Sequence, residues 1–320
     1  MPLPTDLDVQ AHSPEAGPSV ESGILPSEDL RLLKRRSDSA GLLRLGGHLG
    51  VIVLSGWLYG AFSTRWFVAI PAFVVYGFSL VTMFAALHEC VHRTAFKSVW
   101  LNDAVGWVAG LLSFYNSTYY RRYHGVHHRF TQLPGKDPEL DDPRPGTAGE
   151  YLLEILGVPW WTGRLRTHFA VALGRVKSFP FIPTGARAAV IRSGRLQLGV
   201  YGAAIALSIA LARPLFLLYW LLPVAVGQPL LRAILLAEHT GCTQDADPFT
   251  NTRTTLTVWP VRFLMWNMPY HAEHHLFPAI PFHALSAAHE KLRPRLAHVG
   301  RGYVAVNRSI LAAIRALRST

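Results

Sequence analysis

The stretch HECVH, residues 88–92, follows directly on the apolar run WFVAIPAFVVYGFSLVTMFAAL, residues 66–87. The run is long enough to cross a bilayer, because a helical span needs about 20 mostly apolar residues. The pentapeptide matches the H-E-x-x-H pattern, in which two histidines on one helix face bind a metal ion. A span that ends in a metal-binding motif predicts a membrane metalloprotein, but these five residues alone do not separate a zinc protease from another metalloenzyme.

The composition of the 320-residue chain agrees with a membrane protein. Half of the residues are hydrophobic and 16% are charged, against about 25% charged residues in soluble domains. Further spans are predicted at residues 45–62, 196–212 and 214–237, with Arg213 in a polar turn between the last two. We therefore predict an all-α integral membrane protein with four transmembrane helices in two hairpins, capped by a cytoplasmic helical domain.

Several polar residues interrupt the apolar segments. Residues 99–115 form a short apolar run that contains Asn102 and Asp103. This run predicts a half-inserted or interfacial helix, with a full span as the main alternative. His48 is predicted to lie at the membrane interface, and Arg232 to face protein or a polar cavity.

The basic residues predict the orientation of the chain, whose net charge is +11. Residues 1–44, 88–195 and 238–320 hold 5, 14 and 9 Lys and Arg, whereas the hairpin tips hold only Arg65 and Arg213. Cytoplasmic loops carry an excess of Lys and Arg. We therefore place these segments and the active site on the cytoplasmic face of the membrane, and we expect that membrane to be a bacterial inner membrane. No motif for nucleic acid accompanies the basic residues.

The ends of the chain differ from its middle. Residues 1–30 are rich in Pro, Ser, Asp and Glu and predict a disordered tail. No apolar run of the kind found in signal peptides follows the first Met. The membrane domain is expected over residues 31–290, and a basic tail or helix over residues 291–320. The two cysteines, Cys90 and Cys242, are too few for a disulfide scaffold and are predicted to be buried inert thiols, with metal binding as the alternative.

Eight of the fifteen histidines fall into three compact sets. The sets are His88 and His92, then His124, His127 and His128, then His271, His274 and His275. Because residues three and four apart share a helix face, we expect His88 and His92 to form one ligand pair and each H-x-x-H-H set to present two or three imidazoles to one point. A catalytic zinc takes three protein ligands, so eight imidazoles suit two metal ions. Imidazole binds Zn, Cu, Fe and Ni, so the ligand type alone does not name the metal. Histidines rather than carboxylates dominate the three sets, and the site is expected beside a lipid phase. These two features favour a redox-active iron pair that activates O2.

Other polar residues near these sets are candidate members of the site. His239 is predicted as a ninth ligand, with a capping or hydrogen-bonding role as the alternative. Glu89, Glu238 and Glu273 are candidates for holding a ligand imidazole by its second N–H. Asn267 is expected to cap a helix, and binding of a metal-bound water is its alternative.

The acidic run PGKDPELDDPRP, residues 134–145, is predicted to be a solvated loop, although Asp137 and Glu139 have the alternative of touching the metal site. Nearby aromatic residues predict a lipid tunnel or interfacial anchors. These are Tyr115, Tyr119, Tyr120, Tyr123, Trp259, Trp266 and Tyr270. The other histidines are expected to be surface or structural residues: His12, His168, His283, His289 and His298.

HECVH, YRRYHGVHH at residues 120–128 and NMPYHAEHHLFP at residues 267–278 together resemble the membrane fatty acid desaturase and hydroxylase superfamily, and within it the desaturase branch. The resemblance covers roughly residues 45–290. It implies four spans over a cytoplasmic di-iron site whose ligands are the histidines of the three motifs, with His239 as the match to a further ligand. It also implies that O2 and two electrons remove hydrogens from an acyl chain in a tunnel, with no catalytic side chain beyond the metal centre.

The chemistry of the substrate agrees with this resemblance. A methylene C–H bond has no acidic proton, so acid–base catalysis cannot break it. Electrons must come from a partner, because the chain contains no His-Pro-Gly-Gly motif, no GxGxxG fingerprint and no four-cysteine set. We expect a separate ferredoxin or cytochrome, whose acidic face docks on the basic loops. Membrane lipids and a fatty acyl lipid are the other expected partners.

Other functions remain open at this stage. A hydroxylase of lipids, carotenoids or alkanes shares the three-motif theme. An intramembrane metalloprotease would not need the second and third histidine sets. A metal transporter would need polar residues inside its spans, where Arg232 and Gln228 stand nearly alone. The three-residue spacer of HECVH resembles acyl-lipid enzymes more than acyl-CoA enzymes, and the chain length and double-bond position are left open.

Overall fold

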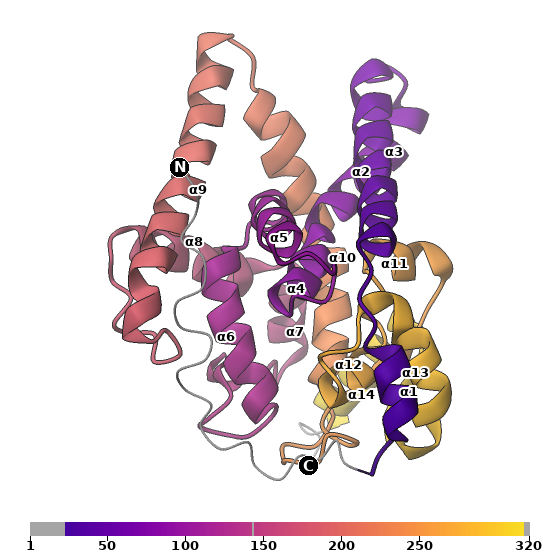
Figure 1. The fold of residues 1–320 in the computed structure, drawn as a ribbon. Coiled ribbons are helices and arrows are strands. Elements are labelled where there is room, and N and C mark those ends of the chain that lie inside the picture. The colour runs from indigo at the N-terminus through magenta and orange to yellow at the C-terminus, as the bar shows by residue number, and fades with distance from the viewer. Residues whose placement is uncertain (1–22, 143, 317–320) are drawn as a thin grey trace.

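A computed structural model describes residues 23–142 and 144–316. Regular structure in this part of the chain is almost entirely helical, and two short strands, β1 (Thr254–Leu256) and β2 (Val299–Arg301), pair in parallel. Long helices reach one end of the molecule, and shorter helices gather at the other (Figure 1). The predicted mainly α-helical architecture is confirmed, and the small sheet is an addition that the sequence did not indicate.

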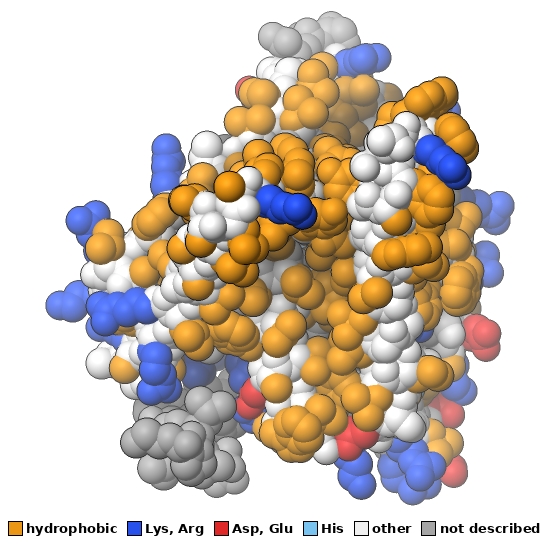
Figure 2. All heavy atoms as spheres, turned by 90° about the horizontal axis from the view of Figure 1, so that it is seen from above, with side chains coloured by type: hydrophobic (Ala, Val, Ile, Leu, Met, Phe, Trp, Pro, Cys, Tyr) orange, Lys and Arg blue, Asp and Glu red, His pale blue; other side chains and the backbone are white. Residues whose placement is uncertain are grey.

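Three helical segments among the described residues are long and apolar enough to cross a membrane. The first is α2 (Asp38–Ala61). In the second, α3 (Trp66–Val81) continues into α4 (Met83–Val91), and in the third the π-helical turn η3 (Leu217–Leu221) continues into α10 (Leu222–His239). Figure 2 shows that hydrophobic side chains dominate the face at the top of Figure 1, as expected of a surface in contact with lipid.

Close helix packing joins the second and third of these segments. A Cβ on Gly227 would lie 2.3 Å from the Gly77 carbonyl oxygen, and a Cβ on Gly77 would lie 2.3 Å from the Pro223 carbonyl oxygen. Only glycine permits backbones to approach this closely, as is common where helices pack in membranes. This contact fixes α10 beside α3, and so brings the ends of both helices together.

Two other predicted membrane segments are helices of a different kind. The predicted span at 196–212 lies in α9 (Arg187–Ala210), which is not among the three apolar helices, and a fourth span stays a prediction. The helix α5 (Val99–Ser113) has 15 residues and is too short to cross a bilayer. Its Asn102 is buried and bonds to the backbone of Phe96, so this polar residue stabilises the start of α5.

The remaining helices are shorter and build the end of the molecule that carries the histidines. They are α1 (Ser27–Leu33), α6 (Ser117–Phe130), α7 (Ala148–Ile155), α8 (Val158–Ala172), α11 (Trp259–Leu264), α12 (His271–Leu276), α13 (Leu285–Leu292) and α14 (Tyr303–Ala316), with the 3₁₀ turns η1 (Pro138–Asp141), η2 (Thr184–Ala186), η4 (Phe282–Ala284) and η5 (Arg293–Arg295).

Both ends of the described chain pack against this helical domain. The predicted disordered tail was too long, because α1 starts at Ser27 and buries Leu33 in an apolar cluster with α13. Residues 1–22 of that prediction, His12 included, lie outside the described residues. In the C-terminal segment, the Asn307 amide of α14 donates to the Ala233 carbonyl of α10 at 2.9 Å.

The prediction that His48 lies at the membrane interface is wrong. Its side chain is fully buried, and Nε2 donates to the Ser79 carbonyl oxygen at 2.8 Å. The other ring nitrogen, Nδ1, accepts the indole N–H of Trp266 at 3.1 Å. Because both nitrogens have partners, this histidine can be buried without an unpaired polar atom. It ties α2 to α3 and to the segment that precedes α12.

Candidate metal centre

Histidines from distant parts of the chain converge at the ends of α4, α6 and α12. One group, which we call the five-histidine group, contains His88, His92, His124, His128 and His274, with one ring nitrogen from each within 4.8 Å of all the others. Nε2 of His128 lies 3.0 Å from Nε2 of His124 and 3.1 Å from Nε2 of His274. Nitrogens bound at right angles to one ion at about 2.1 Å would lie about 3.0 Å apart, so these separations suit a shared metal ion.

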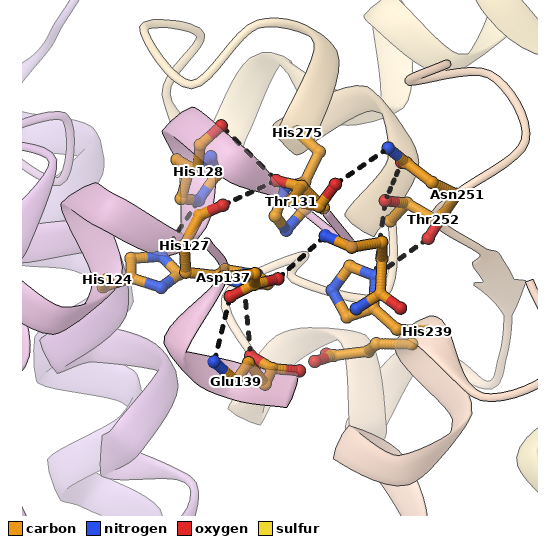
Figure 3. A network of polar contacts seen from close by, with 12 residues as sticks. His124, His127, His128, Thr131, Asp137, Glu139, His239, Asn251, Thr252 and His275 are labelled. Carbon is orange, nitrogen blue, oxygen red and sulfur yellow. Dashed lines mark hydrogen bonds and ion pairs between the residues drawn. The ribbon is translucent and has the colours of Figure 1, made fainter. Parts of the chain in front are cut away.

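A second group, the three-histidine group, lies beside the first. It contains His127, His239 and His275, again with nitrogens within 4.8 Å of one another. These residues come from α6, α10 and α12, and Figure 3 shows their rings turned toward a common region. Nδ1 of His127 donates to Asp137, 3.0 Å from each carboxylate oxygen, and both side chains are buried.

The other two members of the three-histidine group are oriented in the same way. Nδ1 of His239 donates to the Asn251 carbonyl oxygen at 3.1 Å. Nδ1 of His275 donates to the Thr131 hydroxyl at 3.1 Å, and that hydroxyl donates to the His127 carbonyl. Metal-binding histidines usually donate their second N–H in this manner. The Nε2 atoms of these rings therefore face a common point: Nε2 of His239 has no partner among the described residues, and Nε2 of His275 lies 3.1 Å from Nε2 of His271.

Burial keeps most of these imidazoles neutral. It lowers the pKa of His92 to about 3, with a further contribution from nearby Arg121. Burial, followed by repulsion between neighbouring imidazoles, also lowers the pKa values of His124, His128, His271, His274 and His275. A neutral imidazole keeps the lone pair that binds a metal ion. The pKa of His127 is raised, because Glu139 and Asp137 outweigh the opposing effect of burial.

His271 belongs to neither group. Its Nε2 lies 3.1 Å from Nε2 of His275 and 3.5 Å from Oε2 of Glu238, while its Nδ1 is buried without a partner. The structure thus brings eight of the nine predicted ligands into two groups and leaves the ninth at the edge of the three-histidine group. Glu238 lies beside it, and its second carboxylate oxygen is also unpaired among the described residues.

A cavity of about 210 Å³ adjoins both groups. Its wall includes His88 and His124 of the five-histidine group, and His127 and His239 of the three-histidine group. Apolar and aromatic residues form much of the remaining wall: Phe84, Tyr115, Tyr120, Trp160, Leu235 and Met268. As predicted, Arg232 faces this polar cavity. Space of this kind allows an apolar group to lie beside bound metal ions.

A family model described as fatty acid desaturase matches residues 64–307, which cover more than half of the chain and all three histidine motifs.

The chain belongs to the fatty acid desaturase family.

The residues that match the family model include HECVH together with the two further histidine sets. An intramembrane protease would need neither of them.

Several curated desaturases are similar to the chain, each described as an sn-1 oleoyl-lipid 12-desaturase. The relative from Arthrospira platensis is 26% identical over 73% of this chain and 71% of its own length. The relative from Synechocystis sp. is 24% identical over 84% of this chain and 79% of its own. The relative from Picosynechococcus sp. is 30% identical, but over 32% of this chain and 33% of its own.

The prediction that each H-x-x-H-H set presents two or three imidazoles to one point is confirmed for HGVHH and is wrong for HAEHH. His124 and His128 belong to the five-histidine group, whereas His127 belongs to the three-histidine group. Likewise, His274 and His275 lie in different groups. Successive helical residues point about 100° apart, so the adjacent histidines of each motif face different directions, whereas His124 and His128, four residues apart, share a face. Each H-x-x-H-H set therefore contributes to both groups, whereas His88 and His92 both belong to the five-histidine group.

Glu89 and Glu273, two of the carboxylates predicted to hold a ligand imidazole, bond to other partners. Oε1 of Glu89 accepts the Phe282 backbone N–H at 2.9 Å, so it anchors the chain after α12. Glu273 accepts bonds from Thr254 and His289, and so joins α12 to β1 and α13. Neither carboxylate holds an imidazole of the two groups.

Asn267 was predicted to cap a helix, and its backbone N–H bonds to the Arg262 carbonyl at 2.9 Å and so closes the C-terminal end of α11, but its side chain does not cap α12. No side chain caps α12, which starts at His271. The Asn267 amide donates instead to the Phe282 carbonyl at 2.9 Å, and its backbone is left-handed, with φ of 58°. Asparagine tolerates this conformation better than most residues. Asn267 therefore shapes the turn that leads into the third motif.

Asp137 was assigned mainly to a solvated loop, and the structure corrects that view. The carboxylate is buried, and it also accepts the backbone N–H groups of Gln132 and Glu139 at 2.8 and 2.9 Å. Glu139 lies 3.5 Å from Nδ1 of His127. The sequence signal was an Asp ten residues after a motif histidine, at the start of a proline-containing turn, but nothing in the sequence fixed its contact.

The remaining candidate residues, which are the two cysteines, the other histidines and the aromatic residues, are mostly buried. Both cysteines are free and buried, and neither belongs to a metal-binding group of the described residues. His289 is buried against Glu273, and His168 is stacked on Phe114. Among the aromatic candidates, Tyr115, Tyr120 and Tyr123 line the cavity. The others lie elsewhere: Tyr119, Trp266 and Tyr270 are buried, and Trp259 is exposed.

Proposed function

We propose that this chain is an O2-dependent fatty acyl lipid desaturase with a pair of iron ions in the two histidine groups. The observation that carries the proposal is the arrangement of eight imidazoles in two adjacent nitrogen groups beside a cavity whose wall is partly apolar. Family membership supports the reaction class, and the names of the relatives support an acyl chain carried on a membrane lipid. A glycerolipid with an oleoyl chain is the first substrate to test.

The donor set favours redox metals over hydrolytic ones. The two groups consist of imidazoles, and the carboxylates around them act mainly through hydrogen bonds to histidine or backbone. Imidazole suits iron as well as zinc. When bound, a pair of iron ions supplies the activation of O2 that hydrogen removal from an unactivated methylene requires. We assign His88, His92, His124, His128 and His274 to one ion, and His127, His239 and His275 to the other, with His271 adjacent.

The chain's own residues prepare the site for that chemistry. Asp137, Asn251 and Thr131 fix the rings of the three-histidine group before any ligand binds, which lowers the cost of ordering them. Phe84 and Leu235 in the cavity wall exclude water and give a methylene group an apolar surface to pack on. Because the wall reaches histidines of both groups, a carbon placed there lies beside both proposed ions.

The membrane orientation is part of the same proposal. Three helices of the described residues are able to span a bilayer by length and composition, and α9 is our candidate for the fourth. The histidine-bearing end then faces the cytoplasm, since the segments at this end carry most of the Lys and Arg residues. An acyl chain would enter the cavity from the inner leaflet.

The test is expression in a host of known lipid composition, followed by mass spectrometry of its fatty acids. A new double bond in lipid-bound chains is expected, together with two irons per chain in the purified protein. His92→Ala should abolish the product, and His298→Ala, outside both groups, serves as the matched control. A product that gains an oxygen atom instead of losing two hydrogens would make the chain a hydroxylase, and an unchanged lipid profile would contradict the proposal.

A further inference from the structure

The cavity beside the histidine groups has a second polar region in its wall, formed by Tyr115, Arg164 and Arg232, which we call the donor cluster. The Tyr115 hydroxyl accepts the indole N–H of Trp160 and an N–H of Arg232, each at 2.9 Å. The Arg164 guanidinium lies over the same tyrosine ring, with Cζ 4.0 Å from the ring centroid. One tyrosine side chain therefore holds two positive charges at the cavity wall.

The unpaired polar atoms of the donor cluster are all hydrogen-bond donors. A guanidinium has five N–H groups and no acceptor. Among the described residues, the Arg164 guanidinium forms no hydrogen bond, and Nε of Arg232 is buried without a partner. The Tyr115 hydroxyl accepts two N–H groups, so its own proton still needs an acceptor. Buried donors without acceptors are unfavourable, and the cluster therefore suits a ligand with several oxygen atoms.

No carboxylate of the cavity wall neutralises the two arginines of the donor cluster. None of the four acidic side chains in this wall lies within 4.0 Å of either guanidinium: Glu139, Asp142, Glu154 and Glu238. Glu139 and Glu238 lie 3.5 Å from histidine ring nitrogens instead. A third arginine of the wall, Arg144, already donates to the side chain of Gln132. Two guanidiniums without a counter-charge favour an anionic ligand.

The donor cluster lies toward the membrane side of the histidines. Arg232 precedes His239 by seven residues on α10, which is about 10 Å along the helix axis. The junction of α7 and α8 packs on Arg232, since a Cβ on Gly157 would lie 3.8 Å from Arg232 Cγ. Leu156 and Val158, on either side of this glycine, are 49% and 46% exposed. Exposed apolar side chains beside the cluster indicate that its surroundings contact lipid.

We propose that the donor cluster binds the phosphodiester of a membrane glycerophospholipid, whose acyl chain extends along the cavity toward the histidines. This inference rests on the proposed function and names the substrate class. A phosphodiester has one negative charge and two unesterified oxygens, which match the donors of Tyr115, Arg164 and Arg232. A neutral glycolipid offers hydroxyl oxygens but no charge. The cluster therefore selects a phospholipid over a neutral lipid with the same acyl chains.

The experiment measures lipid binding to the metal-loaded full chain by native mass spectrometry in a neutral detergent. The ligands are dioleoylphosphatidylglycerol, monogalactosyl dioleoylglycerol and oleate, so the acyl chain is constant and the head group changes. Wild type should bind the phospholipid about tenfold more tightly than the galactolipid, the effect of one hydrogen bond to a charged group. Arg164→Gln should lose this preference and keep galactolipid binding, whereas Arg164→Lys, which keeps the charge, should retain part of the preference.

The matched control is Arg166→Gln, which removes the same charge from the exposed surface of α8, outside the cavity wall. It should keep the wild-type preference. Equal affinity of wild type for the two glycerolipids, an equal loss of preference in the control, or an equal loss of both lipids in Arg164→Gln overturns the phosphodiester site. So does a dependence on Arg164 for oleate alone, because the cluster would then hold a carboxylate. Absence of desaturated product with every lipid counts against the proposed function instead, and the binding data still decide the phosphodiester site.

Discussion

Replacement of Asp137 by asparagine should selectively weaken the metal ion assigned to the three-histidine group. The carboxylate accepts Nδ1–H of His127 and two backbone N–H groups, from Gln132 and Glu139. Each oxygen receives a backbone donor. The asparagine amide has a single oxygen, so in either orientation its NH2 group faces a backbone N–H.

The expected loss has two components. A buried donor without an acceptor costs about 1–3 kcal/mol of folding stability. Removal of the partner of a metal-binding histidine typically weakens metal binding 10–100-fold, equivalent to about 1.4–2.8 kcal/mol. His127 also loses the negative charge that orients its ring, because Asp137 is the acceptor for its Nδ1–H. The five-histidine group has no contact with this carboxylate and should keep its ion.

The assay is iron content per chain after dialysis against a graded series of chelator concentrations. Asp137→Asn should lose about one of two irons at a chelator concentration that leaves the wild type loaded. Asp141→Asn is the matched control, because Asp141 lies in the 3₁₀ turn that Asp137 caps, but is exposed. Wild-type loading of the Asp137 variant would refute the reasoning. An equal loss of both ions would show that the two groups do not bind independently.

Three further predictions follow from other contacts. Gly227→Ala should destabilise the protein by about 3 kcal/mol, because the new Cβ would lie 2.3 Å from the Gly77 carbonyl oxygen. Gly199→Ala is the control and should not destabilise it, because a Cβ there meets no atom within 4 Å. Thermal unfolding in detergent measures both variants. Glu273→Ala should cost about 2–4 kcal/mol, since buried Thr254 and His289 lose their acceptor, and an unchanged melting temperature would contradict this. Removal of metal by a chelator should lower the melting temperature by several degrees, and addition of metal should restore it, because a ligand that binds the native state stabilises that state. Equal melting temperatures of the metal-free and metal-loaded protein would contradict a metal site in the native state.

The sequence was informative where the chemistry depends on local spacing. Apolar runs of about 20 residues predicted the spans at 66–87 and 214–237, and the structure has apolar helices there. The histidine motifs predicted a metal centre, since i and i+4 residues on a helix share a face whatever the rest of the fold does. His239 was predicted from its place at the end of a span.

The tertiary structure decided which residues meet across the chain. Nothing local to HGVHH shows that His127 turns to a different group from His124, because that choice depends on where α10 and α12 lie. Asp137 and His48 were misjudged for the same reason: their partners come from segments that only folding brings close. The sequence by itself determined the ligand chemistry and the membrane setting, which depend on residue type and helical period. The division into two groups and the cavity beside them came only from packing, because each depends on contacts between elements far apart in the chain.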